Sequence, residues 1–396
     1  MKYIRVITLL FYILICSPSQ AHSENNKIQS LIDELAEAGH RDILFKQEGD
    51  TLKIVYWPIG FRDDYQGYID LKRMIIKYIE NSQKREVNFI ELIQTSWGIP
   101  TVVSRIQRTN LSNKINFTKK YNSLKKTDYS SICNLSPKLM VLFDIPLSVS
   151  FGQPFDPLIF KTGIRPEIRY RLTNGILAYC QVDFYFHNEF DVHQYFKPGN
   201  IGVMVAKTFT DRIISVTNIG AFRKDLYGLN EEINVSLGDD KISVTFHGGL
   251  YGNLFFKNNK FKYGEIVHKL ALLKLVYSIE TYDCKLEFKG GRFLYGDKGI
   301  GFGISRVFKE IEIGFTGIRT KGDIAANIYF SIPIFPKTRK SLANYGIASV
   351  KHFKFKYWYY TNKLGREPEI STSLRNIEGL ASPNHFKFMS QTFREE

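Results

Sequence analysis

From residue 135 onward, apolar and polar residues alternate with a period of two, and this pattern limits the fold more than any other feature of the sequence. The clearest example is residues 283–308, where two alternating runs flank a short turn. In the first run one face holds Tyr282, Cys284, Leu286 and Phe288, and the other holds Asp283, Lys285, Glu287 and Lys289. Strict alternation is typical of strands with one apolar and one polar face. The segment therefore predicts a β-hairpin.

The turn of this hairpin carries residues that favour turns. Asp297 can support local hydrogen bonds and glycine accepts a positive φ, so Gly296, Asp297 and Gly299 are predicted to be structural turn residues. The paired Gly290-Gly291 before the turn indicates a bend or a close approach of two backbones.

Roughly a dozen alternating segments lie between residues 135 and 360, as in a barrel whose strands face lipid outside and water inside. A soluble sandwich or jelly roll shows the same alternation. Aromatic residues near the segment ends favour the barrel. Residues 266–281 are more apolar and less regular, which leaves a helix open there. The predicted fold class is mainly β: an antiparallel outer-membrane-type β-barrel preceded by a small α/β domain.

Residues 1–21 have the form of a secretory signal peptide. Lys2 and Arg5 precede an apolar run at residues 6–15, and Ser19-Gln20-Ala21 has the form of a cleavage site. The apolar run is too short for a transmembrane anchor. The predicted location is the outer membrane of a Gram-negative bacterium, after cleavage. Residues 109–134 are expected to form a basic linker, and residues 361–396 a C-terminal tail or a last strand.

Residues 27–108 predict the small α/β domain. Apolar residues have helical spacing over residues 28–38, where Gly39 is a natural stop, and again over residues 69–79. Short strands are expected between and after these helices, at 42–46, 52–57, 87–95 and 100–106. The segment contains no phosphate loop, metal-ligand spacing or nucleophile motif. Because it lies between the signal and the first barrel strand, we expect it to pack or dock on the periplasmic side.

The chain has a formal net charge of +15, which favours anionic partners. Export argues against nucleic acid, so the expected partners are outer-membrane lipid and an acidic polymer in the barrel interior. The basic side chains on predicted polar faces are candidate polymer or anion contacts: Arg165, Arg169, Arg171, Lys285 and Lys289. The alternative is that these residues pair locally with Glu167, Asp183, Asp283 and Glu287 and only solvate the interior.

No constellation in the sequence indicates catalysis, a metal or a cofactor. The eight histidines show no ligand spacing. Three cysteines remain after cleavage, Cys133, Cys180 and Cys284, and an odd number excludes a fully paired set within one chain. Paired carboxylates can hydrolyse glycosides, and Glu167, Asp183 and Glu287 are the candidates, but acids on polar strand faces usually serve solvation or ion pairing.

The turn region, residues 291–299, reads GRFLYGDKG and is followed by Ser305-Arg306-Val307-Phe308. These residues resemble an aromatic-Leu-x-Gly-Asp-x-Gly turn and Arg-x-Phe found in the YjbH-like outer-membrane proteins, a family associated with exopolysaccharide biosynthesis. The motifs at 220–222, 227–231 and 332–334, and those at 49–52 and 98–100 in the α/β domain, extend the resemblance over most of residues 30–336. The chain has room only for the carboxy-proximal part of longer members. The resemblance implies an outer-membrane location and a part in polysaccharide export or assembly, and supplies no catalytic residue.

We therefore expect a non-enzymatic outer-membrane barrel that takes part in exopolysaccharide export or assembly, as conduit, docking platform or assembly factor. Its partners would be membrane lipid, an acidic exopolysaccharide and other polysaccharide secretion proteins. The alternative is a secreted, soluble β-rich protein that binds or cleaves polysaccharide.

Overall fold

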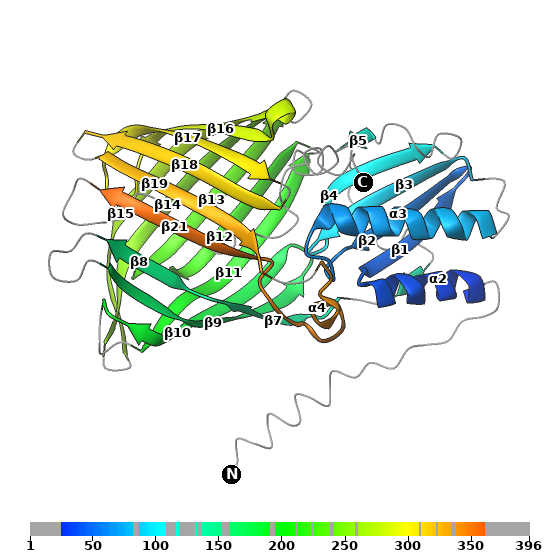
Figure 1. The fold of residues 1–396 in the computed structure, drawn as a ribbon, viewed down its shortest axis with the longest axis horizontal. Helices are drawn as coiled ribbons and strands as arrows, with labels where there is room; N and C mark the ends of the chain where they lie inside the picture. Colours follow the sequence, from blue (N-terminus) through cyan, green and yellow to red (C-terminus); the bar gives the residue numbers. More distant parts are fainter. Residues whose placement is uncertain are drawn as a thin grey trace, which may run out of the picture.

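The structure, a computed structural model, describes residues 25–360 in two parts that lie side by side, an α/β domain and a large barrel (Figure 1). The described residues exclude these segments: 82–86, 108–115, 119–130, 134–135, 152–157, 191–194, 211, 223–224, 238–240, 258–259, 309, 322–323 and 335–336. The signal peptide predicted at 1–21, the tail predicted at 361–396 and most of the predicted linker lie outside the described residues.

The α/β domain has the predicted order of two helices and four main strands. Its elements are α2 (Asn25–Ala38), β1 (Arg41–Glu48), β2 (Thr51–Trp57), α3 (Asp64–Asn81), β3 (Phe89–Ser96) and β4 (Ile99–Gln107). Gly39 ends α2 with a φ of 115°, which glycine adopts readily. Both helices cover one face of the sheet, and their apolar stripes, with Leu35 and Leu71 fully buried, form the domain core (Figure 1).

Two short strands from the predicted linker extend this sheet. β5 (Asn116–Thr118) pairs with β4, and β6 (Ser131–Cys133) pairs with β1, so the strand order is β5-β4-β3-β2-β1-β6. Pairing an otherwise open edge satisfies its backbone groups. These pieces of the connector are thus edge strands of the domain.

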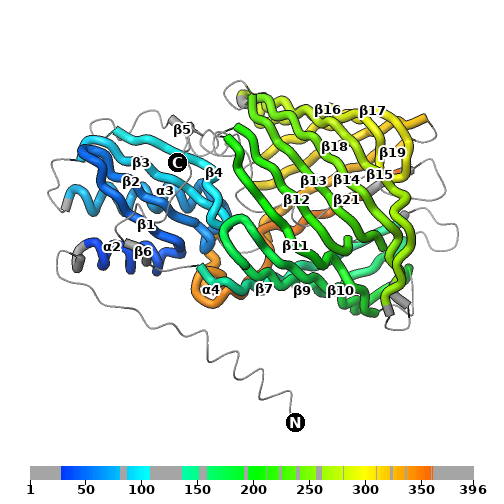
Figure 2. The backbone as a smooth tube through the Cα atoms, turned by 180° about the vertical axis from the view of Figure 1, so that it is seen from behind, coloured from blue at the N-terminus to red at the C-terminus, as the bar shows by residue number. Residues whose placement is uncertain are grey.

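The barrel wall is one sheet of 15 strands, in which neighbours along the chain pair antiparallel from β9 to β19 (Figures 1 and 2). Its strands are β7 (Leu139–Asp144), β8 (Leu147–Phe151), β9 (Leu158–Thr173), β10 (Ile176–Asn188), β11 (Phe196–Thr210), β12 (Ile213–Phe222), β13 (Leu226–Leu237), β14 (Ile242–Lys257), β15 (Lys260–Ile279), β16 (Cys284–Arg292), β17 (Lys298–Phe308), β18 (Ile311–Thr320), β19 (Ile324–Pro333), β20 (Ile347–Ser349) and β21 (His352–Tyr360). A short helix, α4 (Lys340–Tyr345), precedes β20.

Burial in the wall is inverted relative to a soluble protein. On β10, Asp183 is 3% exposed whereas Phe186 is 73% exposed. The other strands also expose apolar side chains outside, and inside, buried polar side chains line the wall between apolar clusters at the two mouths. The period-two pattern thus places one apolar face toward the surroundings and one polar face toward the lumen, as predicted, and the outer-membrane-type barrel is confirmed.

Residues 266–281, where the sequence left a helix open, belong to a strand. β15 pairs with β14 on one side and with β16 on the other. A helix here would leave both neighbours with unpaired backbone groups, which explains why the weaker alternation still forms a strand.

The number of strand positions around the wall is odd, and this determines how the barrel closes. β7 and β8 pair with successive parts of the same neighbour, β9, and together they occupy one strand position around the barrel. β20 and β21 follow each other along the chain and likewise occupy one strand position. When every strand runs opposite to the one before, an odd number makes the first and last strands parallel. β20 accordingly pairs in parallel with β7, with Ile347 opposite Val141 and Ser349 opposite Phe143. Among the described residues no ladder joins β8 to β21.

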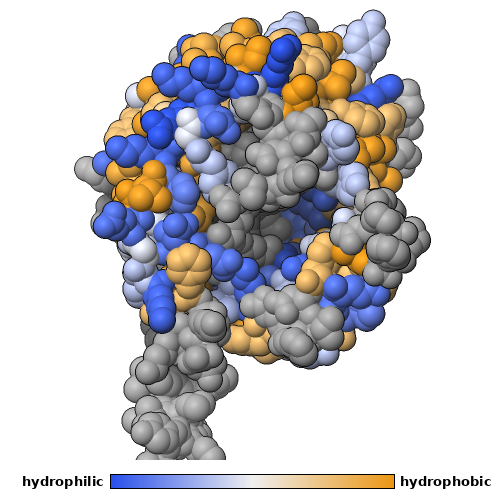
Figure 3. All heavy atoms as spheres, turned by 90° about the vertical axis from the view of Figure 1, so that its left-hand side faces the viewer, coloured by the Kyte–Doolittle hydropathy of each residue, from blue (hydrophilic) through white to orange (hydrophobic). Residues whose placement is uncertain are grey.

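The two mouths of the barrel differ. The α/β domain sits against one of them, here called the domain-side mouth, and the opposite one is the far mouth (Figure 1). Seen from its open end, the far mouth is hollowed, with hydrophilic residues inside (Figure 3). The connections between strands have two to four residues at the domain side, apart from 334–346, which contains α4. At the far mouth they have two to seven residues, and 189–195 is the longest.

Gly296 and Asp297, two of the three predicted turn residues, occupy the far-mouth connection between β16 and β17. The turn lies at residues 293–297, where Phe293 N–H donates to the Asp297 carbonyl at 2.8 Å and Gly296 has a φ of 97°. Gly299, by contrast, is the second residue of β17 and does not have a positive φ. A Cβ at Gly299 would collide with the Arg319 carbonyl of β18, so close backbone approach, not turn geometry, favours glycine there.

No helix in the described parts of the chain is long and apolar enough to cross a membrane.

Gly299→Val tests this packing. The added side chain must displace β18, and overpacking of this kind costs on the order of 1–3 kcal/mol. We expect a clear loss of the folded band that migrates differently when unboiled in a heat-modifiability gel. Gly317→Val is the matched control, because a Cβ at Gly317 meets nothing within 4 Å. An equal loss of the folded band in both variants, or no loss in either, would contradict the explanation.

Candidate functional site

The inner wall formed by β7, β9 and β10 carries a chain of paired charges. Arg165 lies between two carboxylates: its Nε is 2.5 Å from Asp183 Oδ1, and its Nη1 is 2.7 Å from Asp144 Oδ2. Next to it, Arg169 Nε lies 2.5 Å from Glu167 Oε1. An uncompensated charge buried in this wall would cost several kcal/mol, so pairing allows these residues to stay inside.

Neutral side chains extend this network. Gln181 donates to the second oxygen of Glu167, and Asn200 on β11 donates to Gln181 Oε1 at 3.1 Å. Tyr185 donates to Asp183 Oδ2 at 3.0 Å. The result is a polar surface that runs across several strands and presents both donors and acceptors to the lumen.

Two further polar groups line other parts of the lumen. Glu287 on β16 lies 2.5 Å from Lys274 Nζ and 3.3 Å from Lys289 Nζ. Asn230 Oδ1 lies 2.6 Å from both His247 Nε2 and the Tyr251 hydroxyl. The polar interior therefore extends to strands far from β9 and β10.

The five predicted anion contacts all lie on inward faces, and the structure pairs most of them. Arg165, Arg169, Arg171 and Lys289 each form an ion pair with a carboxylate, and Lys285 also has an interaction partner. Local pairing, the alternative left open by the sequence, thus describes their state in the structure. Contact with a polymer stays a prediction for these residues.

Two lysines on β21 give the lumen an exposed basic strip. Lys354 and Lys356 are in register with the inward-facing Ser331 and Tyr329 of β19, and both are exposed. They lie close to the place where the wall closes. The exposed ammonium groups of this strip are accessible to an anionic chain in the lumen.

An apolar cluster lies in the domain-side mouth, against strands β7, β10 and β11. The rings of Trp57 and Trp97 are tilted by 56° with 5.1 Å between their centroids. They pack against inward-facing residues of the barrel: Met140, Leu142, Leu177, Tyr179, Met204 and Ala206. The turn between β3 and β4 brings Trp97 there, and its carbonyl accepts a hydrogen bond from Gly175 N–H of the barrel at 2.9 Å. The domain therefore obstructs this end of the lumen.

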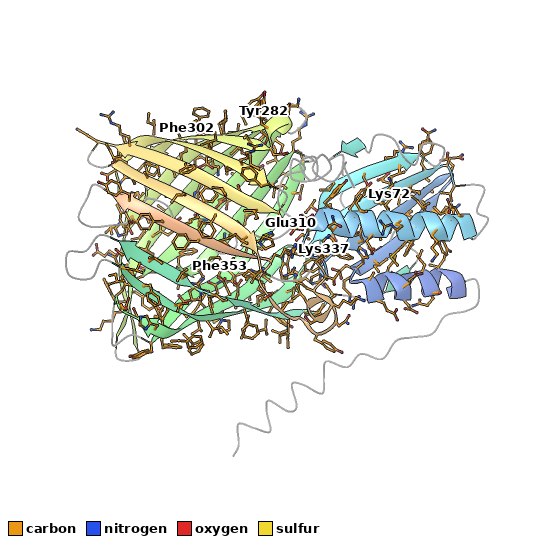
Figure 4. The ribbon with its side chains drawn as sticks, viewed as in Figure 1. Lys72, Tyr282, Phe302, Glu310, Lys337 and Phe353 are labelled. Carbon is orange, nitrogen blue, oxygen red and sulfur yellow. The ribbon has the colours of Figure 1, made fainter. Side chains whose placement is uncertain are left out.

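Ion pairs surround the apolar cluster and fix the domain in place. Asp42 of β1 bonds Arg171 Nη1 of β9 at 2.7 Å, and it also accepts hydrogen bonds from the backbone and hydroxyl of Ser136. Lys351 lies 2.8 Å from Asp64. Arg62 pairs with Glu310 of the β17–β18 connection, and Figure 4 shows Glu310 and Lys337 at the junction of the two parts.

The carboxylates considered for glycoside hydrolysis are engaged as described above: Glu167 with Arg169, Asp183 with Arg165, and Glu287 with two lysines. The described part of the chain contains no group of three or more His, Cys, Asp or Glu side chains that could hold a metal ion. Cys180 and Cys284 are free, half-buried thiols. The side chain of Cys133 lies outside the described residues.

Sequence reasoning did not identify Glu231, a carboxylate on the outward face of β13. It is in register with the outward Thr217, and it accepts hydrogen bonds from the hydroxyls of Ser215 and Thr217. These donors offset the cost of a charged group on a lipid-facing wall. The signal was present: in the adjacent pair Glu231-Glu232, alternation forces one carboxylate outward.

No family model and no curated protein matches the chain. Among solved structures, the chain is similar to in-vitro folded OmpT in its trimer form, an outer membrane protein of Vibrio cholerae, at 9% identity and a TM-score of 0.30. That match covers 59% of this chain and 93% of the other. A loop L8 deletion mutant of OmpT matches at 8% identity and a TM-score of 0.29, over 49% and 86% of the two chains. These values are too low to carry an argument about this chain.

The fold and the site together define the class: an outer-membrane-type β-barrel with a polar lumen, whose domain-side mouth is obstructed by an α/β domain.

Asp42→Ala tests the junction. The change leaves Arg171 buried without a counter-charge, which costs on the order of 3–5 kcal/mol. We expect the α/β domain of the purified chain to undock and become more sensitive to limited proteolysis. Glu48→Ala is the control, because it removes a carboxylate paired with Lys46 and Lys53 on the exposed surface of the same strand. Equal protease sensitivity in both variants would show that Asp42 does not hold the domain.

His40 makes the stability of the α/β domain depend on pH. Its ring is fully buried between Tyr56 and Phe61, and burial lowers its pKa from the ordinary 6.5. Below about pH 6.5 the unfolded chain therefore binds a proton that the folded domain does not. We expect stability to decrease by up to about 1.4 kcal/mol per pH unit as the pH falls from 7 to 5.

Hydrogen exchange of β2 and β3 at several pH values measures this effect. His40→Phe should remove the contribution, whereas His187→Gln, at a half-exposed position paired with Glu189, should keep it. An unchanged pH dependence in His40→Phe would exclude His40 as the cause.

Proposed function

We propose that this chain is a non-enzymatic outer-membrane protein that takes part in the export or assembly of an acidic exopolysaccharide. The observation that carries the proposal is a lumen lined by hydrogen-bonding and basic groups, with an α/β domain fixed at one mouth. Sugar polymers are recognised by dense donors and acceptors, and basic groups attract carboxylated or phosphorylated chains. The polysaccharide itself rests on the sequence resemblance to the YjbH-like proteins.

The orientation that we propose places the α/β domain in the periplasm. Outer-membrane barrels have short periplasmic turns and longer external loops, and here the connections of more than four residues lie at the far mouth, apart from 334–346 with α4. This orientation agrees with entry of the chain through a cleaved signal peptide at residues 1–21. The domain would then be available to other secretion proteins, as a docking site.

The obstructed mouth favours a docking or assembly role over a permanently open conduit. Trp57, Trp97 and the barrel residues around them are buried at the domain-side end, so passage of a polymer through this part of the mouth would require the domain to move. The candidate carboxylates Glu167, Asp183 and Glu287 each form an ion pair with a basic side chain, which does not favour the alternative of a polysaccharide-cleaving protein.

The location is tested by fractionation and by protease digestion of intact cells. The chain should sediment with outer membranes and show heat modifiability, and the α/β domain should stay uncut until the outer membrane is permeabilised. Recovery as a soluble periplasmic protein, or cleavage of the domain in intact cells, would contradict the proposal.

The role in polymer export is tested in cells from which the gene has been deleted. The wild-type chain should restore secreted acidic polysaccharide, and Lys354→Glu with Lys356→Glu should lower it several-fold while the barrel still folds. The control replaces Lys53 and Lys77 of the α/β domain by Glu, which changes the net charge by the same amount. Full secretion by the lumen variant would reject a lumen role, and full secretion without the chain would reject the proposed function.

A further inference from the structure

The outer face of strands β15 to β18 carries a groove in the otherwise convex apolar wall. Its volume is about 870 Å³, and its sides are formed by Leu273, Phe288, Ile300 and Phe302, which are all exposed. Figure 4 shows Phe302 projecting from the wall away from the lumen. The groove is therefore on the face that meets the surroundings of the barrel.

Two glycines leave this groove open. Gly290 is opposite Ile300, and Gly317 is opposite Phe302, so both lie on the outward face. Neither has a positive φ, and an added Cβ would meet nothing within 4 Å at Gly317 and only atoms at 3.7 Å at Gly290. The backbone does not require glycine at either position, so the groove exists because these two side chains are absent.

Three basic residues lie at the far-mouth end of the groove. Arg319 lines it, and Arg292 and Lys298 are opposite each other on β16 and β17, one outward position beyond Gly290 and Ile300. All three are exposed, and none has an ion-pair partner among the described residues. They occupy the first or last two residues of their strands, where a lipid-facing basic residue costs far less free energy than at the midplane of a membrane.

An apolar groove that ends in three unpaired cations is complementary to an anionic lipid. Arginine binds phosphate through paired N–H donors, and each basic residue near a membrane surface adds to the attraction for anionic headgroups. We propose that this groove binds a phosphorylated lipid, with its phosphate held by Arg292, Lys298 and Arg319 and an acyl chain lying over Gly290 and Gly317. The proposal rests on the proposed membrane location of the barrel.

A groove that bound only hydrocarbon would not need the cations, and an interface with a second copy would leave three like charges without counter-charges. Charge complementarity therefore distinguishes the phosphorylated lipid from both.

The test is native mass spectrometry of the full chain in neutral detergent, with dioleoyl phosphatidic acid and dioleoylglycerol as probes. These lipids share their acyl chains and differ in the phosphate. The wild-type chain should bind the phosphatidic acid at least tenfold more tightly. The combined substitutions Arg292→Gln, Lys298→Gln and Arg319→Gln should remove that preference. Gly317→Leu should weaken the binding of both lipids, because the added side chain fills the groove.

The matched control replaces three exposed basic residues at the domain side by Gln: Lys207, Arg212 and Lys241. It changes the net charge equally and should keep the preference. Equal binding of the two probes to the wild-type chain, or equal loss in the control, would overturn the proposal. The proposal would also be overturned if the wild-type chain bound neither lipid but formed a dimer that Gly317→Leu abolishes, since the occupant of the groove would then be a second copy of the chain. Heat modifiability of the same sample shows separately whether the chain forms a folded barrel, so failure of the lipid site is distinguished from failure of the barrel itself.

Discussion

Closure of the wall is the constraint on which the rest of the structure depends. In hydrocarbon, backbone groups at an open sheet edge have no water to bond, so a spanning sheet must close. With an odd number of strand positions the closing pair is parallel, and here three residues of β20 form it. Flanking bonds, from Val141 N–H to the Gly346 carbonyl at 2.6 Å and from Val350 N–H to the Phe143 carbonyl at 2.9 Å, lengthen this short seam.

The seam is coupled to the α/β domain, because the segment before β20 is held by that domain. Arg339 N–H donates to the Gly60 carbonyl, and Arg41 donates from Nε to the Ala343 carbonyl at 3.1 Å. Leu342 and Ala343 of α4 also complete the apolar cluster around Trp57 and Trp97. The domain thus does two things at once: it obstructs the mouth and it positions the strand that closes the barrel.

Alternation made the two faces of the wall predictable, because the period of two is a local property of the sequence. Asp183 and Phe186 are three residues apart, so they lie on opposite faces, as predicted. Long-range contacts were not predictable. Asp42 and Arg171 are 129 residues apart and meet only when the domain docks. β20 is too short to show a pattern, and the turn shifted to 293–297 because Phe293 and Leu294 pack inside the far mouth. The charged residues of the lumen were predicted from the sequence, whereas their ion-pair partners depend on the strand register, which the sequence did not give.

The most direct test is a disulfide across the seam. In a chain with its own cysteines replaced by serine, Val141→Cys and Ile347→Cys occupy paired positions of β7 and β20. The account predicts that they cross-link in the folded barrel, whereas Val149→Cys on β8 with Ile347→Cys does not. A folded, heat-modifiable barrel in which the first pair stays reduced under oxidising conditions would contradict closure by a parallel seam.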